Sequence, residues 1–303
     1  MRTQRAALSK RQRYEERLGW LFVLPVVLGI GIFQLYPTLF SLYASLTQWN
    51  LLTPPRYVGL QNYVDLFTTD RFFAQTMTNT GVYTLGVVVP SMILALFFAI
   101  LLNQEIRGKY FYRAIYFIPV VAPAVAVALL WGWLYEPNFG LINSTLRLVG
   151  IQGPPWLGST KWAMTAVVIE AIWAGLGFTI VIFLAGLQGI SSEYYEAAAI
   201  DGAGFFRQFF FITLPLLSPV TFFILVTGII GTFQDFTVPF VMTRGGPAGA
   251  TQLVVMYLYG LAFTLQNMGL ASAVAYIVFL VIVSLTILNF VLARKWVFYD
   301  ETV

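Results

Sequence analysis

Long stretches without charge are the feature that most constrains this chain. No charged residue occurs between Arg17 and Arg56, and five further apolar stretches follow along the 303 residues. A helix needs about 20 residues to cross the roughly 30 Å hydrocarbon core of a bilayer, and all six stretches reach that length. The sequence therefore predicts an all-α integral membrane protein.

We expect six transmembrane helices. They cover residues 18–46, 72–104, 114–135, 162–188, 216–242 and 270–293. Residues 253–265 are too few to cross, which predicts an interfacial or re-entrant helix. The first span should remain as an uncleaved anchor, because its apolar run is too long for a secretory signal and no small-residue cleavage site ends it.

Composition excludes most enzyme chemistry. The chain contains no Cys and no His, which removes disulfides, thiolate nucleophiles, His-ligated metal sites and Ser-His-Asp triads. It has no G-x-x-x-x-G-K-[ST] motif either, since Gly108-Lys109 is preceded by Asn103 at the place of the first glycine. We expect a protein that is not an enzyme, binds neither metal nor nucleic acid, and does not bind ATP by that motif.

The distribution of basic residues predicts the orientation. With six spans, 12 of the 17 Lys and Arg residues lie on the side that holds both termini. By the positive-inside rule, both termini are predicted to be cytoplasmic. The expected organisation is a basic tail at 1–19, a six-span domain at 20–293 and a second cytoplasmic tail at 294–303.

The cytoplasmic loop 188–215, between the fourth and fifth spans, has the most distinctive pattern. Ser191 and Ser192 offer an N-cap, the acidic and Ala-rich residues 193–200 favour a helix, and Gly202 is expected to turn the chain at positive φ. A second helix rich in Phe follows before Pro215. An acidic helix followed by aromatic residues is typical of a knob that enters a groove on a partner protein.

The spacing Glu196-Ala197-Ala198, three residues, Gly202, nine residues and Ile212-Thr213-Leu214-Pro215 resembles the EAA signature of permease subunits in binding-protein-dependent ABC importers. The resemblance implies a type I permease fold in which this loop is the coupling helix that docks on an ATPase. The coupling residues that it implies are Glu193, Glu196, Ala197, Ala198, Asp201, Gly202, Ala203, Ile212, Leu214 and Pro215.

Further segments resemble the carbohydrate-uptake branch of that family, which includes the maltose transporter. They are Leu24-Pro25 with Leu35-Tyr36-Pro37, residues 57–63, Tyr116-Phe117-Ile118-Pro119 and residues 243–247. The resemblance implies a bacterial inner-membrane complex with a second homologous permease, two ATPase subunits that bind ATP and Mg, and an extracytoplasmic solute-binding protein. Maltose specificity is not implied, because the maltose subunit has two extra spans and a large periplasmic insertion that are missing here.

Two acidic residues lie inside predicted spans, where an ionised side chain costs about 2.5 to 3.5 kcal/mol. Gly228, Thr232 and Asp235 share one face of the fifth span at i, i+4 and i+7, and a second face on the fourth span carries Glu170, Trp173, Gly177 and Phe178. Aromatic rings and hydrogen-bond acceptors suit a sugar, so these faces are candidates for the substrate cavity. Equally, the acids can pair with neighbouring helices while the glycines allow close packing.

Two further hypotheses remain open. An ion-coupled secondary transporter would use Glu170 and Asp235, although the inverted repeat typical of such proteins is missing. On the extracytoplasmic side, Arg244-Gly245-Gly246-Pro247 forms a turn with one cation, which suits contact with the solute-binding protein. An ordinary connecting turn is the alternative.

Overall fold

Long helices account for most of the described chain, which comprises residues 10–104 and 108–298 of a computed structural model. Four helical stretches are long and apolar enough to cross a membrane, and two bent helix pairs raise the number of candidate spans to six. The six-span prediction is consistent with this count. The outer parts of the predicted tails, 1–9 and 299–303, lie outside the described residues, as does Arg107.

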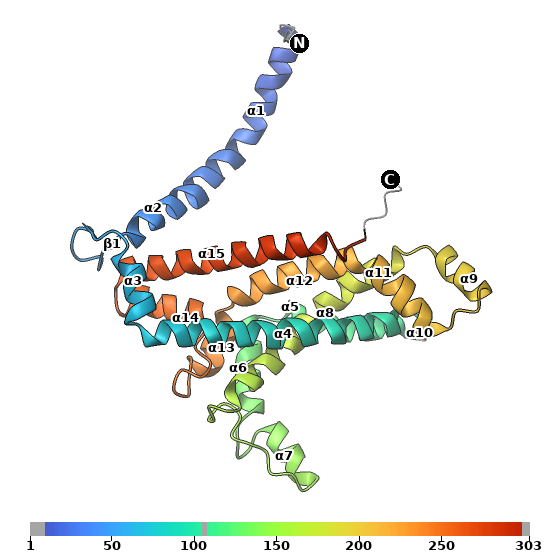
Figure 1. The fold of residues 1–303 in the computed structure, drawn as a ribbon. Coiled ribbons are helices and arrows are strands. Elements are labelled where there is room, and N and C mark those ends of the chain that lie inside the picture. Colours follow the sequence, from blue (N-terminus) through green and yellow to red (C-terminus); the bar gives the residue numbers. More distant parts are fainter. Residues whose placement is uncertain (1–9, 105–107, 299–303) are drawn as a thin grey trace.

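The N-terminal part of the first span projects away from the body of the fold (Figure 1), while its C-terminal part packs against the last long helix, residues 268–293. It consists of α1 (Lys10–Ile30), the π-helical segment η1 (Gly31–Leu35) and α2 (Tyr36–Ser45). The π-helical turn directly precedes Pro37, whose missing N–H cannot continue a regular α-helical ladder. In the most apolar window of this span, no residue is buried inside the chain. Its surface is therefore free to contact lipid or another subunit.

The core lies between α4 (Arg71–Asn103), α8 (Ala163–Gln188) and α12 (Ser218–Phe233), and α15 (Met268–Ala293) packs along α12. The Asp70 carboxylate caps α4 by accepting hydrogen bonds from the backbone N–H groups of Phe72 and Phe73 at 2.9 and 3.0 Å. Small residues such as Ala95 and Ala99 are fully buried and let α8 come close to α4. These four helices form the scaffold of the site.

The third predicted span is not one continuous helix. It divides into α5 (Lys109–Val121) and α6 (Ala124–Leu134), which are bent by 100°. The break falls at Ala122, whose ψ of 142° is extended because Pro123 follows it. The span expected over 114–135 is therefore broken in its middle.

The fifth predicted span is also broken, at two places. A helical stretch of α10 (Phe205–Gln208), η2 (Phe209–Thr213) and α11 (Leu214–Leu216) meets α12 at an angle of 61°. Helix α12 ends at Phe233, and the chain resumes as α13 (Thr237–Thr243). A continuous helix would need Pro239 to donate to the carbonyl of Asp235, which proline cannot do. Asp235 thus lies in a break, and the prediction that it continues the helical stripe of Gly228 and Thr232 was wrong.

One end of the bundle is closed by short elements. The strands β1 (Thr47–Gln48) and β2 (Arg56–Tyr57) pair antiparallel beside α3 (Gln61–Thr68). The Asn62 amide donates to the carbonyl oxygens of Ser45 and Thr47 at 2.8 and 2.9 Å. Helix α14 (Val254–Tyr259) with η3 (Gly260–Thr264) is short, as expected, and packs one side against α15.

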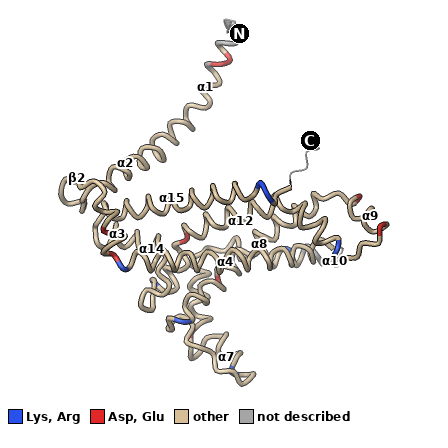
Figure 2. Tube along the Cα trace, in the orientation of Figure 1, with Lys and Arg blue, Asp and Glu red and all other residues tan. Residues whose placement is uncertain are grey.

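Two short helices protrude from the bundle. Helix α7 (Leu141–Leu148) extends from the lobe that follows α6, and α9 (Ser192–Ile200) lies at the end of the bundle opposite α3 (Figure 1). Charged residues of the described chain gather mainly at the ends and on α9, while the long helices are nearly free of them (Figure 2). The two acids of the predicted spans, Glu170 and Asp235, are exceptions.

Candidate translocation and coupling site

Helix α9 has a well-defined start and end. The Ser191 hydroxyl accepts a hydrogen bond from the Glu193 N–H at 3.3 Å. At the other end, Gly202 adopts a φ of +75°, as predicted. Its N–H donates to the Ala199 carbonyl at 3.0 Å and the Ala203 N–H donates to the Ala198 carbonyl at 2.9 Å. This is the Schellman arrangement, in which a left-handed residue ends the helix.

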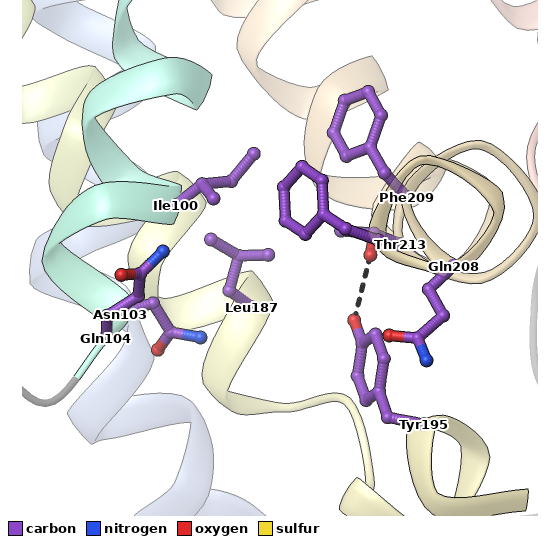
Figure 3. Close-up of a pocket in the computed structure, with 9 residues that line it drawn as sticks. Ile100, Asn103, Gln104, Leu187, Tyr195, Gln208, Phe209 and Thr213 are labelled. Carbon is purple, nitrogen blue, oxygen red and sulfur yellow. Dashed lines mark hydrogen bonds between the residues drawn. The ribbon is translucent and has the colours of Figure 1, made fainter. Parts of the chain in front are cut away.

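A second contact fixes α9 against the helix that follows it. The hydroxyl groups of Tyr195 and Thr213 lie 3.0 Å apart, and Thr213 is buried (Figure 3). The Gln208 amide also donates to the Ala203 carbonyl at 2.9 Å. These two hydrogen bonds tie α9 and the turn after it to the α10–α11 stretch. No role was predicted for Tyr195, although Thr213 lies inside the Ile212-Thr213-Leu214-Pro215 segment of the signature.

The outward surface of α9 combines acids with apolar side chains. Glu193, Glu196, Ala197, Asp201 and Gly202 are exposed, and the acids stand out at the tip of the molecule in Figure 2. Ile200 and Phe206 are 87% and 74% exposed. Ile212, Leu214 and Pro215 are instead half-buried in the following helix. The predicted coupling residues therefore form an exposed tip and a partly buried stem.

A pocket of about 210 Å³ opens between α4, α8 and α12. Phe178, Gly228 and Thr232 line it, as does Thr227, which the sequence analysis missed. The Thr227 and Thr232 hydroxyls donate to the carbonyls of Phe223 and Gly228 at 2.7 and 2.8 Å. Because a hydroxyl has one proton and two lone pairs, each oxygen keeps acceptor capacity toward a ligand. No charged side chain is among the residues that line this pocket.

The two intramembrane acids lie beside α4 and are held differently. Asp235 accepts a hydrogen bond from the Tyr83 hydroxyl across 152 residues of sequence. Glu170 is completely buried, and neither of its carboxyl oxygens has a hydrogen-bond partner among the described residues. Both carboxylates are close enough to Tyr83 to interact with it electrostatically. The tertiary fold thus brings Glu170 and Asp235 into one region, with a tyrosine that the sequence analysis did not consider.

The other predicted substrate residues lie in helix contacts. A Cβ atom added at Gly177 would lie 1.9 Å from the Tyr116 carbonyl oxygen, so α5 and α8 touch through their backbones there. The Trp173 ring meets the edge of Trp131 with centroids 5.6 Å apart. The lining of the pocket does not include Glu170, Trp173, Gly177 or Asp235. The packing alternative describes Gly177 better than the cavity alternative.

The loop after α13 presents one cation from a fixed backbone. Arg244 is exposed, with a φ of +50°, and Gly245 beside it is buried. The hydroxyls of Thr243 and Thr251 lie 2.7 Å apart, and Thr251 donates to the Gly246 carbonyl at 2.8 Å. Asn79 on α4 donates to the Gly249 carbonyl at 2.8 Å. The segment containing Arg244, Gly245, Gly246 and Pro247 is thus held in place, with the Arg244 side chain outward.

Three features define the class of this protein. They are apolar helices of membrane-spanning length, a pocket between three of them and an exposed acidic helix at one end. Together they define a membrane-embedded transport component. Residues 80–297 match the family described as "Binding-protein-dependent transport system inner membrane component". The chain belongs to this family of ABC transporter permeases. Its assignment as a multi-pass inner-membrane transport subunit, not an enzyme, follows from this membership, and ATP is bound by separate subunits.

Relatives match nearly the whole chain. It is 36% identical over 297 residues to the probable ABC transporter permease protein YesP of Bacillus subtilis, covering 97% of this chain and 96% of the relative. It is 33% identical over 287 residues to the trehalose/maltose transport system permease protein MalF of Thermococcus litoralis, covering 94% of this chain and 97% of the relative. It is 36% identical over 295 residues to the lactose transport system permease protein LacF of Rhizobium radiobacter, covering 95% of this chain and 97% of the relative.

The fold is similar to that of a chain in the crystal structure of a bacterial alginate ABC transporter in complex with an alginate pentasaccharide-bound periplasmic protein. The TM-score is 0.81 at 21% identity, and 93% of this chain and 96% of that chain are covered. This likeness confirms the predicted permease fold. Family membership also removes the grounds for the secondary-transporter hypothesis.

Proposed function

We propose that this chain is the permease subunit of an ATP-driven importer for an uncharged di- or oligosaccharide or a related polyol. The pocket between α4, α8 and α12 carries this proposal, because it offers hydroxyl acceptors and the Phe178 ring but no charge. Sugar hydroxyls donate to such acceptors, and the apolar faces of sugar rings pack on aromatic side chains. The names of the lactose and trehalose/maltose relatives support the same class of substrate.

The substrate contacts that we propose are those of Phe178, Gly228 and Thr232, together with Thr227. Asp235 and Glu170 both lie beside Tyr83 and outside the lining of the pocket. The lining contains no Lys or Arg to pair with an anion, which favours a neutral solute. Trp173 and Gly177 set the spacing of α8 against its neighbours. The remaining half of the pathway comes from a second, homologous permease.

We further propose that the tip of α9 docks on one of two ATPase subunits. Glu193, Glu196 and Asp201 are exposed there for basic partner residues, and Ala197, Ala198, Gly202 and Ala203 shape the helix and its turn. Ile212, Leu214 and Pro215 link this tip to α12. Closure of the ATPases would then move α9 and the helices fixed to it as a rigid body.

The proposed orientation places α9 and both termini in the bacterial cytoplasm. In Figure 1 the described end of α15 lies toward the same end of the bundle as α9, and the β1–α3 region lies at the other. The majority of Lys and Arg on the side of the termini supports this orientation. Arg244 would then face the extracytoplasmic solute-binding protein. The exposed first span is available to lipid and to the second permease.

Uptake by the complete transporter, reconstituted in proteoliposomes, tests the proposed substrate class. The solutes are lactose, trehalose and maltotriose, with glycerol 3-phosphate and digalacturonate as anions. We expect uptake of at least one neutral sugar, exclusion of both anions, and loss of uptake in Thr232→Val. Transport of an anion in place of the neutral sugars would overturn the substrate class, while absence of all ATP-dependent uptake would count against the sugar importer itself.

A further inference from the structure

The bend between α11 and α12 is tied to the far end of the chain. The Ser218 hydroxyl donates to the Pro215 carbonyl at 2.5 Å and accepts a hydrogen bond from the Phe298 N–H at 2.8 Å. Ser218 is 3% exposed and its neighbour Leu217 is fully buried. One side chain therefore connects both sides of the bend to a backbone group 80 residues away.

The segment that supplies this N–H is folded against α12. After α15 ends at Ala293, the Val297 N–H donates back to the Ala293 carbonyl at 2.8 Å, which turns the chain. The Trp296 ring meets Phe222 with centroids 6.3 Å apart, and Phe222 meets Phe290 of α15 at 5.0 Å. These rings hold residues 294–298 over the first turns of α12.

The same segment also borders the connection into α9. A hollow of about 360 Å³ lies between the end of α8, the start of α9 and the bend. Ser191 and Tyr194 line it on one side, Leu216 and Pro219 on another, and Phe298 stands at its edge. The end of the described chain is thus next to the proposed coupling helix as well as to the bend.

The position of the bend gives this contact its importance. On one side, α9 is fixed to the α10–α11 stretch through Tyr195 and Thr213. On the other, α12 carries Thr227, Gly228 and Thr232 to the pocket. Movement of α9 can reach the pocket by this route only if the angle at Leu217 is maintained. A flexible bend would absorb the movement.

We propose that residues 294–298 act as a brace that fixes this angle, with Ser218 as the positioning residue. The brace makes α9, α10–α11 and α12 one rigid unit, and it makes transport depend on a segment far from both the pocket and the docking tip. This inference rests on the proposed coupling role of α9 only for its effect on transport. The fixed angle itself is a property of the chain alone.

The variants separate the hydrogen bond from side-chain packing. Phe298→Pro removes the donating N–H, while Phe298→Ala retains it. Ser218→Ala removes the hydroxyl that joins the two sides. Ser41→Ala serves as a matched control, because the Ser41 hydroxyl also donates to its own helix, to the Thr38 carbonyl at 3.1 Å, but lies in α2, away from the bend.

The fixed angle is measured first, in the complete transporter. The chain has no cysteine, so in a transporter whose partner subunits are also freed of cysteine, spin labels at Ser192→Cys and Phe223→Cys report a single distance between α9 and α12. Both positions are exposed. We expect a narrow distance distribution in the otherwise unchanged chain, in Phe298→Ala and in Ser41→Ala, and a broadened one in Phe298→Pro and Ser218→Ala. A narrow distribution in both of the latter variants would overturn the brace.

The number of sugar molecules taken up per ATP hydrolysed is then measured in the unlabelled variants. The sugar is the one that the transporter carries among lactose, trehalose and maltotriose. We expect a two- to tenfold decrease in Phe298→Pro and Ser218→Ala, which corresponds to the loss of one hydrogen bond, and no change in the two controls. A broadened distribution with unchanged uptake per ATP would support the fixed angle and overturn its role in transport.

Discussion

The Tyr83 hydroxyl donates a hydrogen bond to the Asp235 carboxylate, joining α4 to the break between α12 and α13. Tyr83 is 1% exposed, so its hydroxyl cannot exchange this bond for water without moving the helices. The half-buried acid in the helix break therefore has a specific partner inside its own chain. This favours a structural contribution of Asp235 beside any contact with substrate.

Tyr83→Phe should destabilise the transporter by about 1 to 3 kcal/mol, because it leaves the Asp235 carboxylate without its donor. Asp235→Leu should have a similar effect, since the Tyr83 hydroxyl is then buried and unpaired. The check is thermal unfolding of the purified complex for each single variant and for the Tyr83→Phe/Asp235→Leu pair. We expect the double variant to lose less than the sum of the two single losses. Additive losses would show that the two residues act independently.

Gly202→Ala should weaken coupling, because alanine at a φ of +75° is strained by about 1 kcal/mol or more. Gly204→Ala is the matched control, since both glycines have open space for a Cβ and Gly204 has a φ of −73°. The measurement is ATPase activity stimulated by the solute-loaded binding protein. Equal activities in the two variants would contradict a role for the shape of this turn.

Gly177→Ala should separate α5 from α8, because the new Cβ would overlap the Tyr116 carbonyl oxygen. A cost of about 1 to 3 kcal/mol is typical of overpacking. Gly231→Ala in α12 controls for helix propensity, since no atom lies within 4 Å of its added Cβ. Thermal unfolding should distinguish them, with a lower midpoint for Gly177→Ala alone. If Gly177→Ala unfolds at the temperature of the unaltered protein, the close approach is not a constraint.

Arg244→Glu should weaken the response to the solute-loaded binding protein and leave basal ATPase activity unchanged. The side chain is exposed on a fixed loop, so reversing its charge changes the surface without loss of packing. Titration of the binding protein at low and high salt checks this, because a charge contact weakens as salt rises. An identical titration curve for Arg244→Glu would favour the ordinary connecting turn.

The Glu136 carboxylate, in the loop after α6, accepts hydrogen bonds from the N–H groups of Phe139 and Asn138 at 2.8 and 2.6 Å. These bonds lower the pKa of Glu136, with the Phe139 contact contributing most. A carboxyl with a lowered folded-state pKa stabilises the fold above its ordinary value near 4, and the effect disappears as pH falls through the folded pKa.

We therefore expect amide hydrogen exchange at Phe139 to be protected above about pH 4 and to lose protection below it. In Glu136→Gln, the protection should be weaker at every pH and should show no such step. A pH step of the same size in this variant would assign the effect to another group.

The sequence by itself determined much of the local structure. Long apolar stretches fixed the number of candidate spans, because satisfying the backbone in lipid requires helix over about 20 residues. Capping by Ser191 and the left-handed turn at Gly202 were also predictable, because both depend on the conformational preferences of residues close in sequence.

Only the tertiary structure decided how these elements act together. Pro123 and Pro239 lie at the breaks in the third and fifth spans, but neither break was predicted. The 100° bend depends on the packing of α5 against α8 and of α6 against α13. The partners of Asp235, Thr213 and Ser218 were likewise not predictable from the sequence. Sequence periodicity predicts which residues share a helix face. A hydrogen bond between residues far apart in sequence depends on which faces of two helices come into contact, and the packing of the whole chain determines those contacts.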